Sequence, residues 1–361
     1  MQVIKARNVN AAYMQGLSLL RSDGVRQGSR AGEVLVMPTP VTTVYERPTE
    51  RVLFEPNRDA NPFFHLGEAL WMLAGRNDAR WLDRFVSDFS TRFAEEDGLQ
   101  HGAYGYRWRQ HFDVEGGGDI HAPDQLDTII GLLKRNPEDR RIVLTMWDPV
   151  ADLNTARKDI PCNTHAYLRL RPAELDLPGM EEKKAWRALD LTVCCRSNDA
   201  VWGAYGANAV HFSILQEYLA ARLGAAVGTY YQISNNFHVY TEVLNKVWPV
   251  RAAIWEDLNY TENKVKPFPL VSDPESFDVE LDRFLDELNV TLGEHGVFGS
   301  YKNAFFPEVA GPFFQAHKCW KAKEYSSAYS WLEHMPENND WRLAAEEWFD
   351  RRQAKRMSRD D

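Results

Sequence analysis

The side chains best suited to chemistry gather in one short stretch, residues 191–218, which reads LTVCCRSNDAVWGAYGANAVHFSILQEY. Its apolar, β-prone start predicts a strand, and its second half has the apolar spacing of a helix. Between the two lie a cation, a hydroxyl, a carboxylate and an amide, namely Arg196, Ser197, Asp199 and Asn208. A loop of this composition is suited to holding a small polar ligand, because a guanidinium can bind a phosphate through its planar fork of donors.

The elements on either side of this loop must position these side chains. Strand 191–195 is bounded by charge, and from residue 209 the apolar positions 210, 212, 214, 215, 218, 219 and 223 recur at helical spacing. Gly224 follows as a stop signal. The sequence therefore predicts a strand that passes through a polar loop into a long, buried helix.

A cysteine is the best candidate nucleophile. The four cysteines, Cys162, Cys194, Cys195 and Cys319, form no CxxC pair and no spacing typical of metal ligands, so a reduced setting without a metal is expected. Cys162 follows Pro161 at the entry of a strand predicted at 164–171. Taken alone, such a cysteine is most often a small hydrophobic residue, whereas a deprotonated cysteine attacks electrophilic carbon.

The composition limits the class of protein. The chain has 361 residues, 44% of them hydrophobic and 12% aromatic, which is ample for a core. Its formal net charge of -10 argues against direct nucleic-acid binding. The N-terminus MQVIKARNVN has no apolar core of signal-peptide length, and no apolar run approaches a membrane span. We expect a cytoplasmic protein.

The order Arg-Ser-x-Asp, then Gly, then Asn entering a helix resembles the pyrimidine-binding segment of the thymidylate synthase family, which includes the nucleotide hydroxymethylases. The motif Tyr104-Gly105-x-x-Trp108-Arg109 and the Pro-Cys setting of Cys162 are also similar to that family, and the resemblance spans roughly residues 20 to 245. It implies an α/β (α+β) fold with a large mixed β-sheet and helices. We expect a catalytic domain over residues 1–270 and a helical C-terminal extension over residues 271–361.

The resemblance also implies a role for each matching residue. Cys162 would attack C6 of the pyrimidine, Glu68 and Tyr104 would organise proton transfer, and Asn208 would bind O4 and N3 of uracil. Arg196 would activate the thiol and bind the phosphate. The remaining implied ligands are Arg26, Arg140, Arg141 and Ser197 for the nucleotide, with the two arginines at 140 and 141 donated across a homodimer, His238 and Tyr240 for the sugar 3′-hydroxyl, and Asp199 for the pterin of 5,10-methylenetetrahydrofolate.

Several of these residues have a structural interpretation as well. Arg26 lies in a Gly-rich segment that could be a surface hairpin turn. Glu68 could sit at the solvated edge of the helix predicted within 63–82, and Arg140 with Arg141 could be a solvated pair. His238 could be structural in the strand predicted from GTYYQISNNFHVYTEV. These residues follow one another in the same order as the matching residues of the family, which favours their roles in a nucleotide site.

The amide of Asn208 favours dUMP, because an amide can donate to a carbonyl and accept from N3–H, whereas an aspartate would suit cytosine. In the resemblance, the tryptophan over the folate falls near Ser90, the histidine after the nucleophile is replaced by Asn163, and no closing apolar tail is recognisable. In the reactions of this family, the folate first delivers a methylene group to C5 of the base. Reduction of this exocyclic methylene by hydride gives a methyl group and needs a dry, closed site, whereas addition of water gives a hydroxymethyl group. We therefore expect C5 hydroxymethylation of dUMP, and the resemblance is greatest to the hydroxymethylases with which bacterial viruses make modified pyrimidines for their DNA. A viral protein of this kind would act in the host cytoplasm.

Three alternatives stay open. Thymidylate synthesis is the first, with three amphipathic helices predicted beyond residue 270 acting as the lid rather than only packing on the core. The second is hydroxymethylation of dCMP. A binding protein without catalysis is the third.

Overall fold

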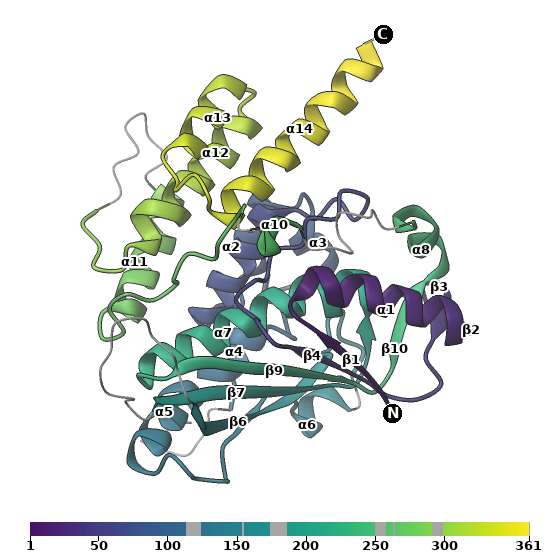
Figure 1. The fold of residues 1–361 in the computed structure, drawn as a ribbon, viewed down its shortest axis with the longest axis vertical. Coiled ribbons are helices and arrows are strands. Elements are labelled where there is room, and N and C mark those ends of the chain that lie inside the picture. The colour runs from purple at the N-terminus through teal and green to yellow at the C-terminus, as the bar shows by residue number, and fades with distance from the viewer. Residues whose placement is uncertain are drawn as a thin grey trace.

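The computed structural model describes residues 1–112, 124–153, 155–173, 186–249, 258–262, 264–290 and 299–360. One large sheet forms the lower part of the molecule in Figure 1, and α1 (Val9–Asp23) and α7 (Asn208–Arg222) lie on one of its faces. Helices from the last quarter of the chain project from the upper part, with the C-terminal end far from the sheet.

The large sheet has six strands in the order β1 (Gln2–Ala6), β4 (Val41–Tyr45), β9 (Ala226–Ser234), β7 (Trp186–Cys195), β6 (Asn163–Ala173) and β5 (Val143–Thr145). The pairs β1–β4 and β7–β9 are parallel, and the other three are antiparallel. The sheet is mixed, which confirms the predicted fold class. Strand β4, VTTVY, is buried along its whole length, as its β-branched composition suits.

A second sheet of four strands joins distant parts of the chain. Its order is β2 (Val25–Ser29), β3 (Gly32–Val36), β10 (Phe237–Tyr240) and β8 (Asn198–Asp199). The segment GTYYQISNNFHVYTEV, predicted as one strand, is therefore two strands in two different sheets, separated at Asn235 and Asn236. A turn at two asparagines is physically reasonable, because asparagine tolerates turn geometry. The Gly-rich segment around Arg26 is the hairpin β2–β3.

The remaining elements are helical. They are α2 (Pro62–Leu73), η1 (Ala79–Arg84), α3 (Phe89–Phe93), α4 (Tyr104–Arg109), α5 (Gln125–Arg135), α6 (Pro149–Asp152), η2 (Ala200–Ala207), α8 (Thr241–Val247), α10 (Leu258–Thr261), α11 (Phe277–Val290), η3 (Phe306–Ala310), α12 (Gly311–Lys321), α13 (Tyr325–Glu333) and α14 (Asp340–Asp360). Among the described residues, no helix combines the length and the apolar composition needed to cross a membrane.

Helix α7 is the centre of the core. It packs on strands β7 and β9 and against α2, and it has buried residues on every side, as a helix enclosed by other elements must. The helix ends where predicted, since Gly224 has a φ of +61° that suits glycine. The segment before α7 was predicted as a loop, whereas residues 200–207 form the π-helical turn η2.

The C-terminal helices pack on α2 through aromatic side chains. The ring of Phe63 lies 4.4 Å from that of Phe313 on α12 and 5.4 Å from that of Phe349 on α14, measured between centroids. Residues 313–335, predicted as one helix, are two, because the chain turns at Lys323, whose φ is +66°. The division of the chain at residue 270 stays a prediction.

Candidate active site

A cavity of about 280 Å³ brings six of the predicted site residues together. They come from α2, α4 and α7 and from the starts of β6 and β8, so the cavity lies where the two sheets and three helices meet. The predicted residues that line it are Glu68, Tyr104, Cys162, Ser197, Asp199 and Asn208.

The candidate nucleophile is held at the entry of β6. The Tyr104 hydroxyl accepts hydrogen bonds from the backbone N–H groups of Cys162 at 3.0 Å and of Asn163 at 3.1 Å. The register between β6 and β7 also shifts directly after this point, between Asn163 and His165, as bulges near functional sites often do. Burial raises the pKa of Tyr104 well above its usual value, so the phenol stays protonated and can donate.

The surroundings of the Cys162 thiol shift its pKa in opposite directions. Burial raises the pKa of Cys162, the Arg196 guanidinium lowers it, and the Asp159 carboxylate raises it, with a net increase. Arg196 lies beside the nucleophile because its backbone N–H donates to the Cys162 carbonyl at 2.8 Å and its Nε donates to the Pro161 carbonyl at 2.8 Å. The guanidinium therefore favours the thiolate, but burial has the larger effect on the pKa.

A chain of side-chain amides leads into the cavity and ends at Asn208. Gln232 donates from Nε2 to the Ala204 carbonyl at 3.4 Å and to the Tyr230 hydroxyl at 2.9 Å, so its Oε1 accepts from Asn198 Nδ2 at 2.9 Å. Asn198 Oδ1 then accepts from Asn208 Nδ2 at 3.1 Å.

The last link continues past Asn208, whose Oδ1 accepts from Asn163 Nδ2 at 3.0 Å. A backbone carbonyl can only accept, so the carbonyl of Ala204 orients every amide in the series. The amide of Asn208 is thereby fixed with one N–H and one lone pair left for a ligand.

Asp199 caps the turn that leads to α7. Its Oδ1 accepts from the backbone N–H groups of Val201 at 2.8 Å and Trp202 at 2.6 Å. Its Oδ2 is buried and has no hydrogen-bond partner in the part of the chain that the structure describes. Burial raises the pKa of Asp199, while the hydrogen bonds from the turn and His238 lower it. A buried acceptor without a donor is suited to a ligand that brings N–H groups.

His238 lies beside this carboxylate and Tyr240 lies beside His238, but neither lines the cavity. His238 pairs with Asp199 in register between β10 and β8, and its ring centroid lies 5.9 Å from that of Tyr240. The two side chains share one face of the small sheet, as their spacing predicted.

Three predicted arginines do not reach the cavity in a single chain. Arg26 is exposed, forms an ion pair with Glu33 and points to the opposite face of the small sheet from His238, since it pairs with Leu35. Arg140 and Arg141 are exposed before the edge strand β5, and Arg141 binds Asp139 at 2.7 Å. Their predicted roles stay predictions.

Sequence reasoning missed several residues that line the cavity, among them His211, Asp159 and Trp202. His211 follows Asn208 by three residues on α7, a spacing that places both on one helix face and could have revealed it. Asp159 precedes Cys162 in an irregular segment, where no periodicity identifies it. Trp202 lies in the π-helical turn and is 52% exposed, with the Arg58 guanidinium carbon 4.1 Å from its ring centroid.

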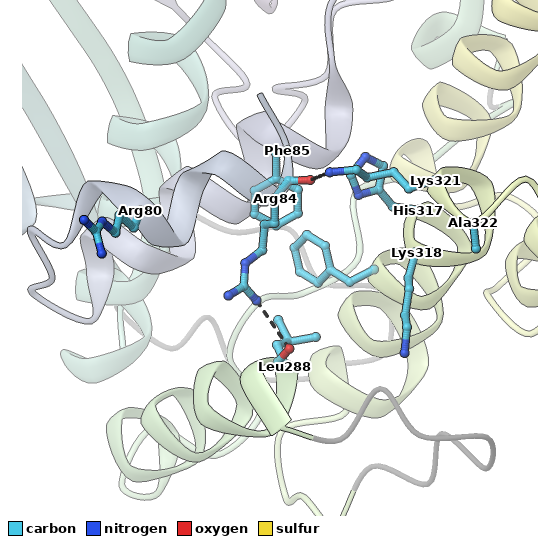
Figure 2. A pocket seen from close by; sticks show the side chains of 9 residues that line it. Arg80, Arg84, Phe85, Leu288, His317, Lys318, Lys321 and Ala322 are labelled. Carbon is cyan, nitrogen blue, oxygen red and sulfur yellow. Dashed lines mark hydrogen bonds between the residues drawn. The ribbon is translucent and has the colours of Figure 1, made fainter. Parts of the chain in front are cut away.

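A larger cavity, of about 490 Å³, lies between η1 and helices α11 and α12 (Figure 2). Arg84 donates to the Leu288 carbonyl at 3.3 Å, and Lys321 donates to the Arg84 carbonyl at 2.9 Å. This cavity holds none of the predicted site residues, so size does not identify the reactive site. No group of three or more His, Cys, Asp or Glu side chains that could hold a metal is found among the described residues.

Comparison with known proteins gives one family and three informative relatives. The family model described as thymidylate synthase matches residues 20–257. A deoxyuridylate hydroxymethyltransferase of Pseudomonas phage M6 is 46% identical, over 98% of this chain and 95% of the relative. Proteins of the same name from Bacillus phage SP01 and Delftia phage PhiW-14 are 33% and 25% identical, over 76% and 66% of this chain and 70% and 62% of their own length.

Proposed function

Because the chain belongs to the thymidylate synthase family, we propose that it is a deoxyuridylate hydroxymethyltransferase. The reaction converts dUMP, 5,10-methylenetetrahydrofolate and water into 5-hydroxymethyl-dUMP and tetrahydrofolate. One observation carries the proposal: a chain 46% identical to a phage deoxyuridylate hydroxymethyltransferase places Cys162, Tyr104, Asn208 and Glu68 around one cavity. Because these relatives are phage proteins, the proposed place of action is the cytoplasm of a host cell.

The nucleophile of the proposed reaction is the thiolate of Cys162, which adds to C6 of the base and makes C5 nucleophilic. Arg196 favours the thiolate electrostatically. The protonated hydroxyl of Tyr104 is available to donate inside the cavity, because its two described hydrogen bonds are accepted from backbone N–H groups. Glu68 is a carboxylate on the same cavity and can accept a proton.

The fixed amide of Asn208 supports uracil as the base. With Nδ2 bound to Asn198 and Oδ1 bound to Asn163, the remaining N–H can donate to O4 and the remaining lone pair can accept from N3–H. Cytosine offers a donor at position 4 and an acceptor at position 3, so it requires the opposite orientation. In that orientation, Asn208 Oδ1 would face Asn198 Oδ1, and two acceptors would meet without a donor between them.

Two residues fit the folate co-substrate, which supplies the one-carbon unit. Asp199 Oδ2, a buried acceptor without a described donor, fits the N–H groups of a pterin. Trp202 offers a half-exposed indole at the same cavity, where flat rings can stack. His238 and Tyr240, next to Asp199, are the proposed contacts of the sugar hydroxyl.

A homodimer with shared sites is also part of the proposal. Val143, Tyr167 and Tyr231 lie in one cross-strand row on the large sheet, on the face away from α7, and Val143 and Tyr167 are 43% and 45% exposed. A sheet face that exposes a row of large side chains in this way suits a two-fold partner. In such a dimer, Arg140 and Arg141 from the neighbouring edge would bind the phosphate in the other subunit, together with Arg26 and Ser197.

The decisive experiment is product analysis with purified protein, dUMP and methylenetetrahydrofolate in ¹⁸O-labelled water. The proposal expects 5-hydroxymethyl-dUMP that carries ¹⁸O, with no rise in dihydrofolate absorbance. Formation of dTMP with dihydrofolate would identify a thymidylate synthase instead. Preferential use of dCMP would overturn the assignment of the base.

A further inference from the structure

His211 has no assigned part in the proposed reaction, yet its ring faces the reactive cavity. It is one turn beyond Asn208 on α7, and both residues are buried and line the same cavity. His211 Nε2 lies 3.0 Å from Glu68 Oε2 on α2. Two acid–base groups from two packed helices therefore meet at the side of the cavity that carries the base-reading amide.

The pair is close without having the alignment of a hydrogen bond. Three atoms have no hydrogen-bond partner among the described residues: both ring nitrogens of His211 and the Oε2 atom of Glu68. Buried polar atoms are rarely left without partners, because the loss of their hydration is costly. Both groups are thus arranged to bind a third polar molecule inside the cavity, such as water.

The surroundings of the pair are strongly polar. His65 precedes Glu68 by one turn on α2, and its pKa is lowered well below the usual value by burial, by Arg58 and by His211. Asp159, on the cavity wall, is electrostatically coupled to Glu68, and its Oδ2 accepts from Gln100 at 2.7 Å. With Glu68 and His211, Asp159 makes this side of the cavity polar.

We propose that His211 is a catalytic residue that, together with Glu68, binds and activates the water that adds to the exocyclic carbon. The inference rests on the proposed function and deepens it. The carbon at C5 is adjacent to the C4 carbonyl that Asn208 would read, and His211 shares the helix face of Asn208. A water held by the pair is therefore beside the carbon that must be hydrated.

The step balances without an oxidant or reductant. The water oxygen forms a bond to the exocyclic methylene carbon while its proton passes to the Glu68–His211 pair. The methylene π electrons move onto C5 and O4 as an enolate. The enolate then re-forms the C5–C6 double bond, the bond between C6 and the Cys162 sulfur breaks, and the thiolate takes up a proton.

The test is a single turnover with enzyme in excess over [5-³H]dUMP. Tritium release reports attack by Cys162, one-carbon transfer and loss of the C5 proton, all of which precede water addition. For His211→Gln, we expect the rate of tritium release to change less than about threefold and the rate of hydroxymethyl-dUMP appearance to fall roughly 100-fold, as for loss of an acid–base group. Nucleotide covalently bound to the enzyme should accumulate between the two events.

The control is His317→Gln, which removes another buried histidine, on α12 and outside the reactive cavity. Both rates should stay close to the wild type. If His211→Gln slows both rates equally, or neither, the inference is wrong. Should that variant not fold, His211→Asn is measured in the same way with the same two readings. Failure of the proposed function is distinct, because the wild-type enzyme would then yield no hydroxymethyl-dUMP.

Discussion

Removal of the Asn198 amide should weaken the preference for uracil without touching any ligand contact proposed above. Asn198 is buried, and its Oδ1 is the described acceptor of Asn208 Nδ2. In Asn198→Leu this restraint is absent. Asn163 cannot replace it, because Asn163 Oδ1 has no described partner and the amide of Asn163 can turn with that of Asn208.

The size of the expected change in specificity follows from the contacts that the Asn208 side-chain amide would make if it were flipped in the wild-type protein. Reversal exchanges the Asn198–Asn208 hydrogen bond for two opposed oxygens, a change of about 1–3 kcal/mol for a buried polar pair. That range corresponds to roughly 5- to 150-fold in relative specificity. Asn198→Leu should therefore lower the ratio of kcat/KM for dUMP to that for dCMP by a factor within this range.

Asn198→Asp is the matched control, because a carboxylate keeps an acceptor toward Asn208 while it loses the donor toward Gln232. It should retain the preference for dUMP. The assay is the specificity ratio from direct competition of the two nucleotides, with thermal unfolding followed for each variant. A wild-type ratio in Asn198→Leu, or an equal loss in Asn198→Asp, would refute the role of the amide series.

Four further predictions address other parts of the molecule. Trp202→Ala should raise KM for the folate about 3- to 10-fold, with kcat/KM for dUMP at saturating folate changed less, because one stacking surface is lost; an unchanged folate KM would remove Trp202 from the site. An equal mixture of Cys162→Ala and Arg141→Ala subunits, each inactive alone, should recover roughly a quarter of the wild-type activity if sites are shared across a two-fold axis, and no recovery would contradict sharing. Since burial raises the pKa of Cys162, kcat/KM should increase from pH 7 toward pH 9, and Arg196→Gln should move that increase to higher pH; a shift to lower pH would be inconsistent with the electrostatic role. Phe63→Ala should lower the free energy of unfolding by about 3–5 kcal/mol in denaturant titration, because the fully buried ring joins α2 to the C-terminal helices.

Local sequence signals located the elements that carry the site. The alternation of β6, the all-round apolar pattern of α7 and its stop at Gly224 follow from side-chain periodicity and backbone freedom. The segment before α7 was predicted less well, since η2 is a π-helical turn that no periodicity marks. The two strands within GTYYQISNNFHVYTEV look continuous in sequence, and only tertiary pairing assigns them to different sheets.

The composition of the site was predictable only in part. The six predicted residues that line the cavity belong to motifs with fixed spacing. Asp159 has no such signal because it lies in an irregular segment, and the contact between Gln232 and Asn198 has none because it joins strands of two different sheets. The C-terminal helices were predicted as helices, but neither of the two roles considered for them follows from an amphipathic pattern. Their contacts with Phe63 are what show that they pack on the core.

The choice between hydration and reduction of the exocyclic carbon depends on the polarity of the wall that this carbon faces. Reduction requires that water be kept away from an electrophilic methylene, whereas this wall carries Glu68, Asp159 and His211 within one cavity. The described C-terminal helices contribute no residue to the lining of that cavity. The buried Glu68 Oε2 and the His211 imidazole, which have no described hydrogen-bond partners, would gain stability by binding water. A polar wall of this kind suits the proposed addition of water better than it suits hydride transfer.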